Sequence, residues 1–374
     1  MVIQKYSVMD LDRVIPSLPE SQRALAERIF HICSSEGELR PPPAMNEWIT
    51  KQFGTLEGVL RQKLVKIFNR VSHEGAIYNA LRAKRPLESR ERLRVEAQII
   101  DASISDPLDN PLEDTPEDVF GRVKGKYCIT ASNIAKFDGL HGMIVFEGRN
   151  PLRFDRERII DYIDTGLEWA RRARESDPEA KYFLFIWNCL RRAGASLLHG
   201  HAQVCLGHHM HYSRIEGLRE DAEAYYRKYG SNYFEDLFKI HESLHCGIEK
   251  NGIKIMAYLT PVKEKEIFFF GPRLDLTFKE MVHDVLACLR DRMQVSAFNL
   301  VLLMPPLGKT EESWEGFPVI ARVVDRGDPR SGSCDIGSME LYACNVISSD
   351  PLQVAGILEN YLAQPHAEDE YSAM

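Results

Sequence analysis

The sequence predicts an α+β fold made of two units with the same order of elements, preceded by an N-terminal helical extension. Between residues 126 and 206, apolar and partly β-branched runs surround one long stretch of helical spacing, in the order strand, strand, helix, strand, strand. The same order recurs between residues 254 and 325 with little residue identity, which indicates a duplicated unit. At 374 residues the chain is long enough for two such units and an extension.

We predict three segments: residues 1–75 form the extension, residues 76–215 the first unit and residues 216–374 the second. Apolar side chains at helical spacing, among them Leu56, Leu60 and Leu64, predict that residues 19–72 are helical around a Pro-rich break.

Each unit opens with a pair of strands, continues with a helix and closes with two more strands. In the first unit the hairpin flanks Phe137-Asp138-Gly139, and a loop rich in Gly and Ala separates the last two strands. The predicted elements are strands 126–135 and 141–146, helix 154–174, and strands 182–187 and 197–206. In the second unit they are strands 254–259 and 266–270, helix 277–293, strands 298–304 and 317–325, and a closing helix 351–362.

Composition excludes several classes of protein. A net charge of −8 argues against a general nucleic-acid binder, which needs a basic face. The eight cysteines include no C-x-x-C pair, so neither a disulfide framework nor a Cys-rich zinc site is expected. The polar start, Met1 to Arg13, is unlike a signal peptide, and no apolar run reaches the ~20 residues that span a bilayer. We therefore expect a cytoplasmic protein without a membrane partner.

Three polar side chains alternate along the last strand of the first unit. His199, His201 and Gln203 are two residues apart, so they project from one face, while Gly200 and Ala202 between them are small. A lone strand histidine is more often structural, but three such groups after a Gly-rich loop favour function. A neutral imidazole is a good nucleophile, because its unperturbed pKa is ~6.5, and it can attack phosphorus to form a phosphoramidate.

The preceding loop offers groups that stabilise negative charge. Gly194, Ala195 and Ser196 can present backbone N–H groups and one hydroxyl, and the Gln203 amide can donate to a phosphate oxygen.

Together, Asn188, Gly194-x-Ser196 and His199-x-His201-x-Gln203 resemble the active-site strand of galactose-1-phosphate uridylyltransferases. These form a branch of the histidine-triad (HIT) superfamily, alongside dinucleoside-tetraphosphate and nucleotide-sugar phosphorylases. The resemblance implies two HIT-like units, and it implies that His201 accepts the nucleotidyl group. Ser196 and Gln203 would hold the phosphates, and Asn188 would lie in the site.

A second segment resembles the same family. Arg82, Lys84 and Arg85, between Asn79 and Pro86, are similar to its basic Arg-Ala-Lys-Arg-Pro stretch and would face phosphate. The alternative is a solvated basic turn. Asn133 falls near a family position that contacts the nucleoside.

The family's metal ligands are missing. Many uridylyltransferases hold zinc with a Cys-x-x-Cys pair, a later His and the first His of the motif. Here the pair is absent, and Asn150 stands where the later His is expected. The family's second metal site uses histidines in the second half, and residues 319–323, which stand at that place, contain none. We therefore expect no metal and no cofactor, with His199 orienting the loop. His208, His209 and His211 are weak metal candidates, and a packing role suits His141 at least as well as a catalytic one.

The leading hypothesis is a nucleotidyltransferase that moves a nucleoside monophosphate from a nucleoside diphosphate sugar to a sugar phosphate through nucleotidyl-His201. One alternative is a phosphorylase that uses inorganic phosphate on a nucleotide sugar or a dinucleoside polyphosphate. Another is a nucleotide-binding protein without turnover. The resemblance is also compatible with a homodimer.

Overall fold

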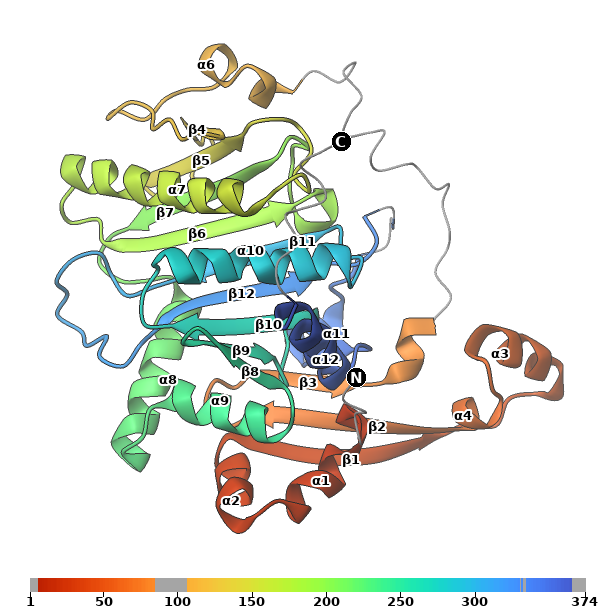
Figure 1. Ribbon diagram of the computed structural model, residues 1–374. Coiled ribbons are helices and arrows are strands. Elements are labelled where there is room, and N and C mark those ends of the chain that lie inside the picture. The colour runs from red at the N-terminus through yellow and green to blue at the C-terminus, as the bar shows by residue number, and fades with distance from the viewer. Residues whose placement is uncertain (1–5, 85–105, 330, 332–333, 365–374) are drawn as a thin grey trace.

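A nine-stranded sheet forms the centre of the computed structural model, which describes residues 6–84, 106–329, 331 and 334–364 (Figure 1). Its order is β4-β5-β7-β6-β11-β12-β10-β9-β8, and each strand is antiparallel to its neighbours. The strands are β4 (Cys128–Ser132), β5 (Leu140–Phe146), β6 (Tyr182–Cys189), β7 (His201–Gly207), β8 (Gly247–Lys250), β9 (Ile253–Ala257), β10 (Glu264–Gly271), β11 (Phe298–Leu303) and β12 (Val319–Asp325).

The two halves of this sheet follow one plan, which confirms the predicted duplicated α+β fold. In the first half, β4 and β5 precede helix α7 (Arg156–Ser176), and β6 and β7 follow it. In the second half, β9 and β10 precede α10 (Leu276–Asp291), and β11 and β12 follow it. Both helices lie on the same face of the sheet (Figure 1). The halves join where β6 pairs with β11, and Asn188 stands opposite Asn299 at this junction.

The two long helices form where the sequence supplies both a cap and an apolar face. The carboxylates of Asp155 and Asp275 accept hydrogen bonds from backbone N–H groups of the first turns of α7 and α10. Trp169 of α7 and Trp187 of β6 are fully buried between helix and sheet. Burying a large apolar side chain stabilises a fold by roughly 1.5–3 kcal/mol, so these residues fix the helices to the sheet.

The N-terminal extension is only partly helical. Helices α1 (Leu11–Ser17), α2 (Glu20–Ile29), α3 (Asn46–Phe53) and α4 (Glu57–Leu60) are present. The helical prediction for 19–72 is wrong in two places, because β1 (Phe30–Glu38) and β2 (Arg61–Asn69) pair along their whole length. Along β2, the buried Val65 and Ile67 alternate with exposed residues, so the strand period decides this segment.

A second, four-stranded sheet ties the extension to the C-terminal part of the chain. Its order is β1-β2-β3-β13, with β3 (Gly75–Tyr78) parallel to β13 (Asn345–Ile347). The remaining elements are η1 (Val8–Asp10), η2 (Pro43–Met45), η3 (Ala80–Lys84), η4 (Pro107–Asp109), α6 (Pro111–Asp114), η5 (Arg191–Ala193), α8 (Ser213–Tyr229), α9 (Tyr233–Ser243), α11 (Ser338–Tyr342) and α12 (Pro351–Leu362). The predicted segment boundaries fall at the start of β3 and inside α8, and the division itself stays a prediction.

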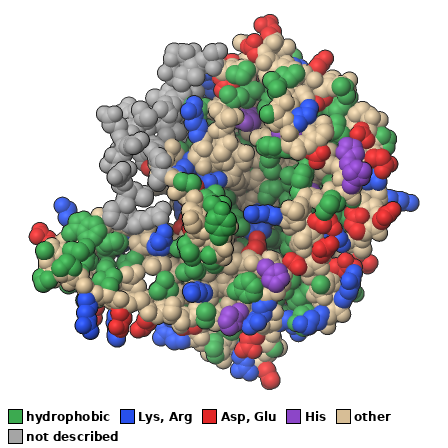
Figure 2. Space-filling model, turned by 180° about the vertical axis from the view of Figure 1, so that it is seen from behind, with side chains coloured by type: hydrophobic (Ala, Val, Ile, Leu, Met, Phe, Trp, Pro, Cys, Tyr) green, Lys and Arg blue, Asp and Glu red, His purple; other side chains and the backbone are tan. Residues whose placement is uncertain are grey.

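The face of the large sheet opposite α7 and α10 differs between the halves. In the second half, Phe268 and Ile320 pack in one apolar cluster with Phe30 and Ile67 of the extension and Phe234 of α9. In the first half, the corresponding face carries the polar side chains of β5 and β7 discussed below. Figure 2 shows the molecule from behind, where hydrophobic side chains gather in the middle of the face and Lys and Arg side chains lie among them.

Candidate active site

His201, the predicted nucleophile, is the first residue of β7 and stands opposite Val145 of β5. Its side chain lies on the face away from α7, and only 6% of the residue is exposed. Gly200 packs so tightly that a Cβ would lie 2.7 Å from the Phe146 ring and 3.2 Å from the Pro151 backbone. The small residue before His201 therefore lets the chain pass close to β5, as the sequence suggested.

A single hydrogen bond determines which nitrogen of His201 is basic. Nδ1 lies 2.8 Å from the backbone oxygen of His199. Because a carbonyl oxygen only accepts, Nδ1 carries the hydrogen, and the lone pair is on Nε2. Burial lowers the pKa of His201 below the ordinary 6.5. The ring is thus neutral at physiological pH, and Nε2 is its nucleophilic atom.

Gln203 points from the same face of β7 and is oriented by His141 of β5. Phe137 donates its backbone N–H to Nδ1 of His141 at 2.9 Å, so Nε2 of His141 carries the hydrogen and donates to Oε1 of Gln203 at 2.9 Å. The Gln203 NH2 group is thereby the end left to donate to a ligand. Burial lowers the pKa of His141, which keeps the ring in the neutral form that this arrangement needs.

The orienting role of His141 was not predicted from the sequence, which favoured packing at least as much. The signal was its position: β5 lies beside β7 in the sheet, and His141 follows the turn at Phe137, whose ring also stacks on it at 4.6 Å.

His199 is held from both sides of its ring. Nε2 lies 2.9 Å from the carbonyl oxygen of Phe146, and Nδ1 lies 3.1 Å from a carboxylate oxygen of Asp109. Arg149 also pairs with Asp109, and its hydrogen bond is the main reason that the pKa of this carboxyl is lowered. The His199 carbonyl that fixes His201 therefore belongs to a residue locked by η4 and the end of β5.

This arrangement does not fit the zinc that many uridylyltransferases hold. Both ring nitrogens of His199 are engaged, and the Asn150 side chain accepts a hydrogen bond from the Leu152 backbone. Within the described residues, no group of three or more His, Cys, Asp or Glu side chains could hold a metal ion. His208 instead binds Asp177 at 2.8 Å, and His211 is buried, which lowers its pKa to about 4.

The loop between β6 and β7 has the backbone of a tight turn. Leu190 adopts a φ of 70°, and its carbonyl accepts hydrogen bonds from Ala193 and Ala195. Gly194 adopts a φ of 96°, which an L side chain rarely tolerates. Ser196 is exposed, and Asn188 is half-buried at the end of β6. The predicted loop residues thus connect Asn188, near the end of β6, to His201 at the start of β7, at one end of the sheet.

The basic segment is not brought to His201 by any contact that the described residues make. Arg82 and Lys84 are exposed in η3. Lys84 donates to the Phe53 carbonyl of the extension, and the charge of Arg82 acts on Glu340 of α11. Arg85 lies outside the described residues. Asn133 is half-buried beside His141, and its backbone N–H donates to the His141 carbonyl.

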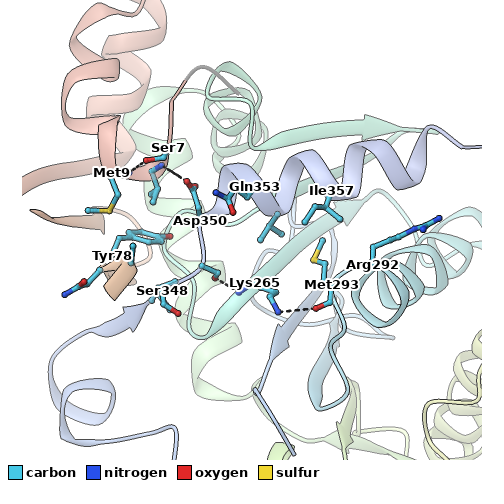
Figure 3. Close-up of a pocket in the computed structure, with 16 residues that line it drawn as sticks. Ser7, Met9, Tyr78, Lys265, Arg292, Met293, Ser348, Asp350, Gln353 and Ile357 are labelled. Atoms are coloured by element: carbon cyan, nitrogen blue, oxygen red, sulfur yellow. Dashed lines mark hydrogen bonds between the residues drawn. The ribbon is translucent and has the colours of Figure 1, made fainter. Parts of the chain in front are cut away.

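A cleft of about 570 Å³ lies elsewhere, and none of the predicted site residues lines it (Figure 3). Its walls come from the N-terminal segment, β3, β13 and α12, with Lys265 and Arg292 on one side. In the described parts of the chain, no helix is both long and apolar enough for a bilayer crossing.

No protein-family model and no curated protein matches the chain. Solved structures do. An ADP-glucose phosphorylase from Arabidopsis thaliana with bound ADP-glucose matches with a TM-score of 0.59 and 16% identity, over 77% of this chain and 95% of that chain. A uridylyltransferase matches with a TM-score of 0.54 and 15% identity, over 80% and 99%. A GalT-like protein from Arabidopsis thaliana matches with a TM-score of 0.53 and 16% identity, over 68% and 91%.

These matches establish the class of fold. It is the duplicated α+β fold of these solved structures, which is the fold that the resemblance of the motif implied.

Proposed function

We propose that the protein transfers a nucleoside monophosphate by way of His201. Nε2 of His201 attacks the α-phosphorus of a nucleoside diphosphate sugar, and a P–N bond forms. The P–O bond to the departing sugar phosphate breaks, and its oxygen keeps the electron pair. A phosphate oxygen of a sugar phosphate then attacks the same phosphorus, and the P–N bond breaks to release free imidazole.

The observation that carries this proposal is the 2.8 Å contact between Nδ1 of His201 and its neighbour's carbonyl. It keeps the lone pair on Nε2 in a neutral, buried ring. A protein that only binds nucleotides has no need of a nucleophile held this way. The NH2 groups of Gln203 and Asn188, with the backbone N–H and the hydroxyl of Ser196, would stabilise the negative charge on the phosphoryl oxygens.

Inorganic phosphate is the second candidate for the acceptor, and one observation favours it. In the second half, the face that corresponds to the His201 face is filled by the extension and α9. Arg322, half-buried there, forms ion pairs with Glu266 and Glu74. The covered face reduces the open surface beside the site, and a small acceptor needs less of it than a sugar phosphate does.

Intact-protein mass spectrometry with UDP-, ADP- and GDP-sugars and diadenosine tetraphosphate tests the proposal. We expect wild type to gain the mass of one nucleoside monophosphate with at least one donor, and His201→Ala to gain none. His31→Ala, a change at an exposed histidine of β1, is the control and should behave as wild type. Adding a sugar phosphate or inorganic phosphate should then discharge the adduct and identify the acceptor. Nucleotide binding without an adduct would favour a protein without turnover.

A further inference from the structure

At the junction of the two halves, Asn188 of β6 and Asn299 of β11 stand opposite one another in the sheet. The Asn299 side chain makes three hydrogen bonds. Nδ2 donates to Oδ1 of Asn188 at 2.7 Å and to the backbone oxygen of Ala193 at 2.7 Å, and Oδ1 accepts from Nη1 of Arg326 at 2.6 Å. A half-buried amide thus joins β11, β6 and the loop before His201.

The chemistry of the partners fixes the direction of this amide. A guanidinium only donates and a carbonyl only accepts, so Oδ1 of Asn299 must face Arg326 and Nδ2 must face Ala193. Nδ2 therefore also meets the oxygen of Asn188, and the Asn188 NH2 group is turned the other way. Arg326 is itself fixed by two 2.9 Å hydrogen bonds to the Asp335 carboxylate.

We propose that Asn299 is a positioning residue for the transfer reaction, supplied by the second half of the chain to the site of the first half. It turns the Asn188 NH2 group towards the phosphoryl oxygens and holds the Ala193 carbonyl, and with it the turn that leads to Ser196, in place. The proposal rests on the proposed function, since it assigns a role in that reaction. It gives the second unit a part in the chemistry.

Asn299→Asp tests this inference, because aspartate has the same shape and still accepts from Arg326 but cannot donate. Asn188 would then flip to donate to the introduced carboxylate, turning its own oxygen towards the phosphates, and the Ala193 carbonyl would lose its donor. Losing one donor to a developing oxyanion typically costs about 10²–10³-fold in rate. We expect the rate of nucleotidyl-His201 formation to fall at least about 10²-fold in single-turnover experiments with the reactive donor.

Asn360→Asp is the matched control, because the Asn360 amide contacts only a carbonyl of its own helix, α12, in the described structure. It should react at the wild-type rate. Since Asn299 acts partly through Asn188, Asn299→Asp should cost at least about tenfold less in an Asn188→Ala background than in wild type. The melting temperatures of wild type and the variants show whether a slower reaction is caused by loss of folding.

A second readout keeps the inference testable if wild type forms no adduct, which would contradict the proposed function alone. The dissociation constants of UMP, AMP, GMP and the parent nucleosides are measured for each variant by calorimetry. We expect Asn299→Asp to weaken binding of the monophosphate that binds wild type by about tenfold, the effect of ~1.4 kcal/mol, and to leave its nucleoside unchanged. Equal monophosphate constants, or equal adduct rates, for Asn299→Asp and Asn360→Asp would overturn the inference.

Discussion

At the scale of single residues, the environment of each histidine determines what it can do. His201 is buried and donates from Nδ1 to one backbone carbonyl. It is therefore a neutral base whose lone pair is on Nε2. His199 is held through both ring nitrogens, by the Asp109 carboxylate and by the Phe146 carbonyl. A histidine thus has the form that a nucleophile requires at position 201, and a histidine two residues earlier is fixed on both sides of its ring.

This difference predicts how the reaction depends on pH. Only neutral His201 is a nucleophile, and burial lowers its pKa, so the neutral form persists at a pH where an ordinary histidine is half protonated. The Asp106 carboxylate nearby acts in the opposite direction, and the effect of burial is larger. We expect the single-turnover rate of adduct formation to stay near its pH 7.5 value at pH 6.5, and to fall only in more acidic buffer.

A nucleoside diphosphate sugar is the right donor for this pH profile, because its phosphates have no second ionisation near neutrality. A rate that is already halved at pH 6.5 or above would show that burial does not control this histidine.

At the scale of elements, the site is assembled by segments that are distant in the sequence. The alternation in His199-x-His201-x-Gln203 was sufficient to place these side chains on one face. It could not show that η4 would bring Asp109 to His199, because the two residues are 90 positions apart. Nor could it place Asn299 beside Asn188, since that contact depends on the pairing of β6 with β11.

The role of η4 can be tested at Asp109. Asp109→Ala removes an acceptor from His199 and the ion pair with Arg149, so the backbone that fixes His201 is less well held. A displacement of about 1 Å near a reacting atom can cost about 10²-fold in rate. We expect adduct formation to slow by about that factor, while the melting temperature changes little, because the ion pair is partly exposed.

Asp114→Ala, at an exposed position of α6 nearby, provides the comparison and should leave the rate unaltered. If both variants react alike, Asp109 has no part in positioning His201.

At the scale of the whole molecule, the two units were easier to predict than the extension. Helix 154–174 and strand 182–187 are close to α7 and β6, because capping residues and apolar periods are local signals. Strand β1, with Ser34, Ser35 and Gly37, has no such signal and exists because β2 pairs with it. The partly exposed ion pair between Glu74 and Arg322 joins residues 248 positions apart, so no local pattern could indicate that the extension covers the second half.

A buried histidine in α9, one of the elements that cover the second half, should make the stability of the protein depend on pH. His241 of α9 is fully buried, and burial lowers its pKa to about 4. Its folded-state pKa is below the unfolded value of ~6.5, so the unfolded chain binds the extra proton first, and stability is lost as pH falls below 6.5. From pH 7.5 to pH 5, His241 should reduce the free energy of unfolding by about 2 kcal/mol.

Urea unfolding of wild type and His241→Gln at both pH values measures this contribution. The variant should lose about 2 kcal/mol less than wild type over the same interval. An equal loss in the two proteins would mean that His241 does not titrate with unfolding.

The central claim is that His201 carries the nucleotidyl group, and peptide mapping of the trapped adduct tests it most directly. Wild type is mixed with the reactive donor without acceptor, kept at alkaline pH, where phosphoramidates survive, digested, and sequenced by tandem mass spectrometry. The account predicts one nucleoside monophosphate on His201, released by brief acid treatment. A nucleotidyl group on His199, on Ser196 or on any other residue would contradict it.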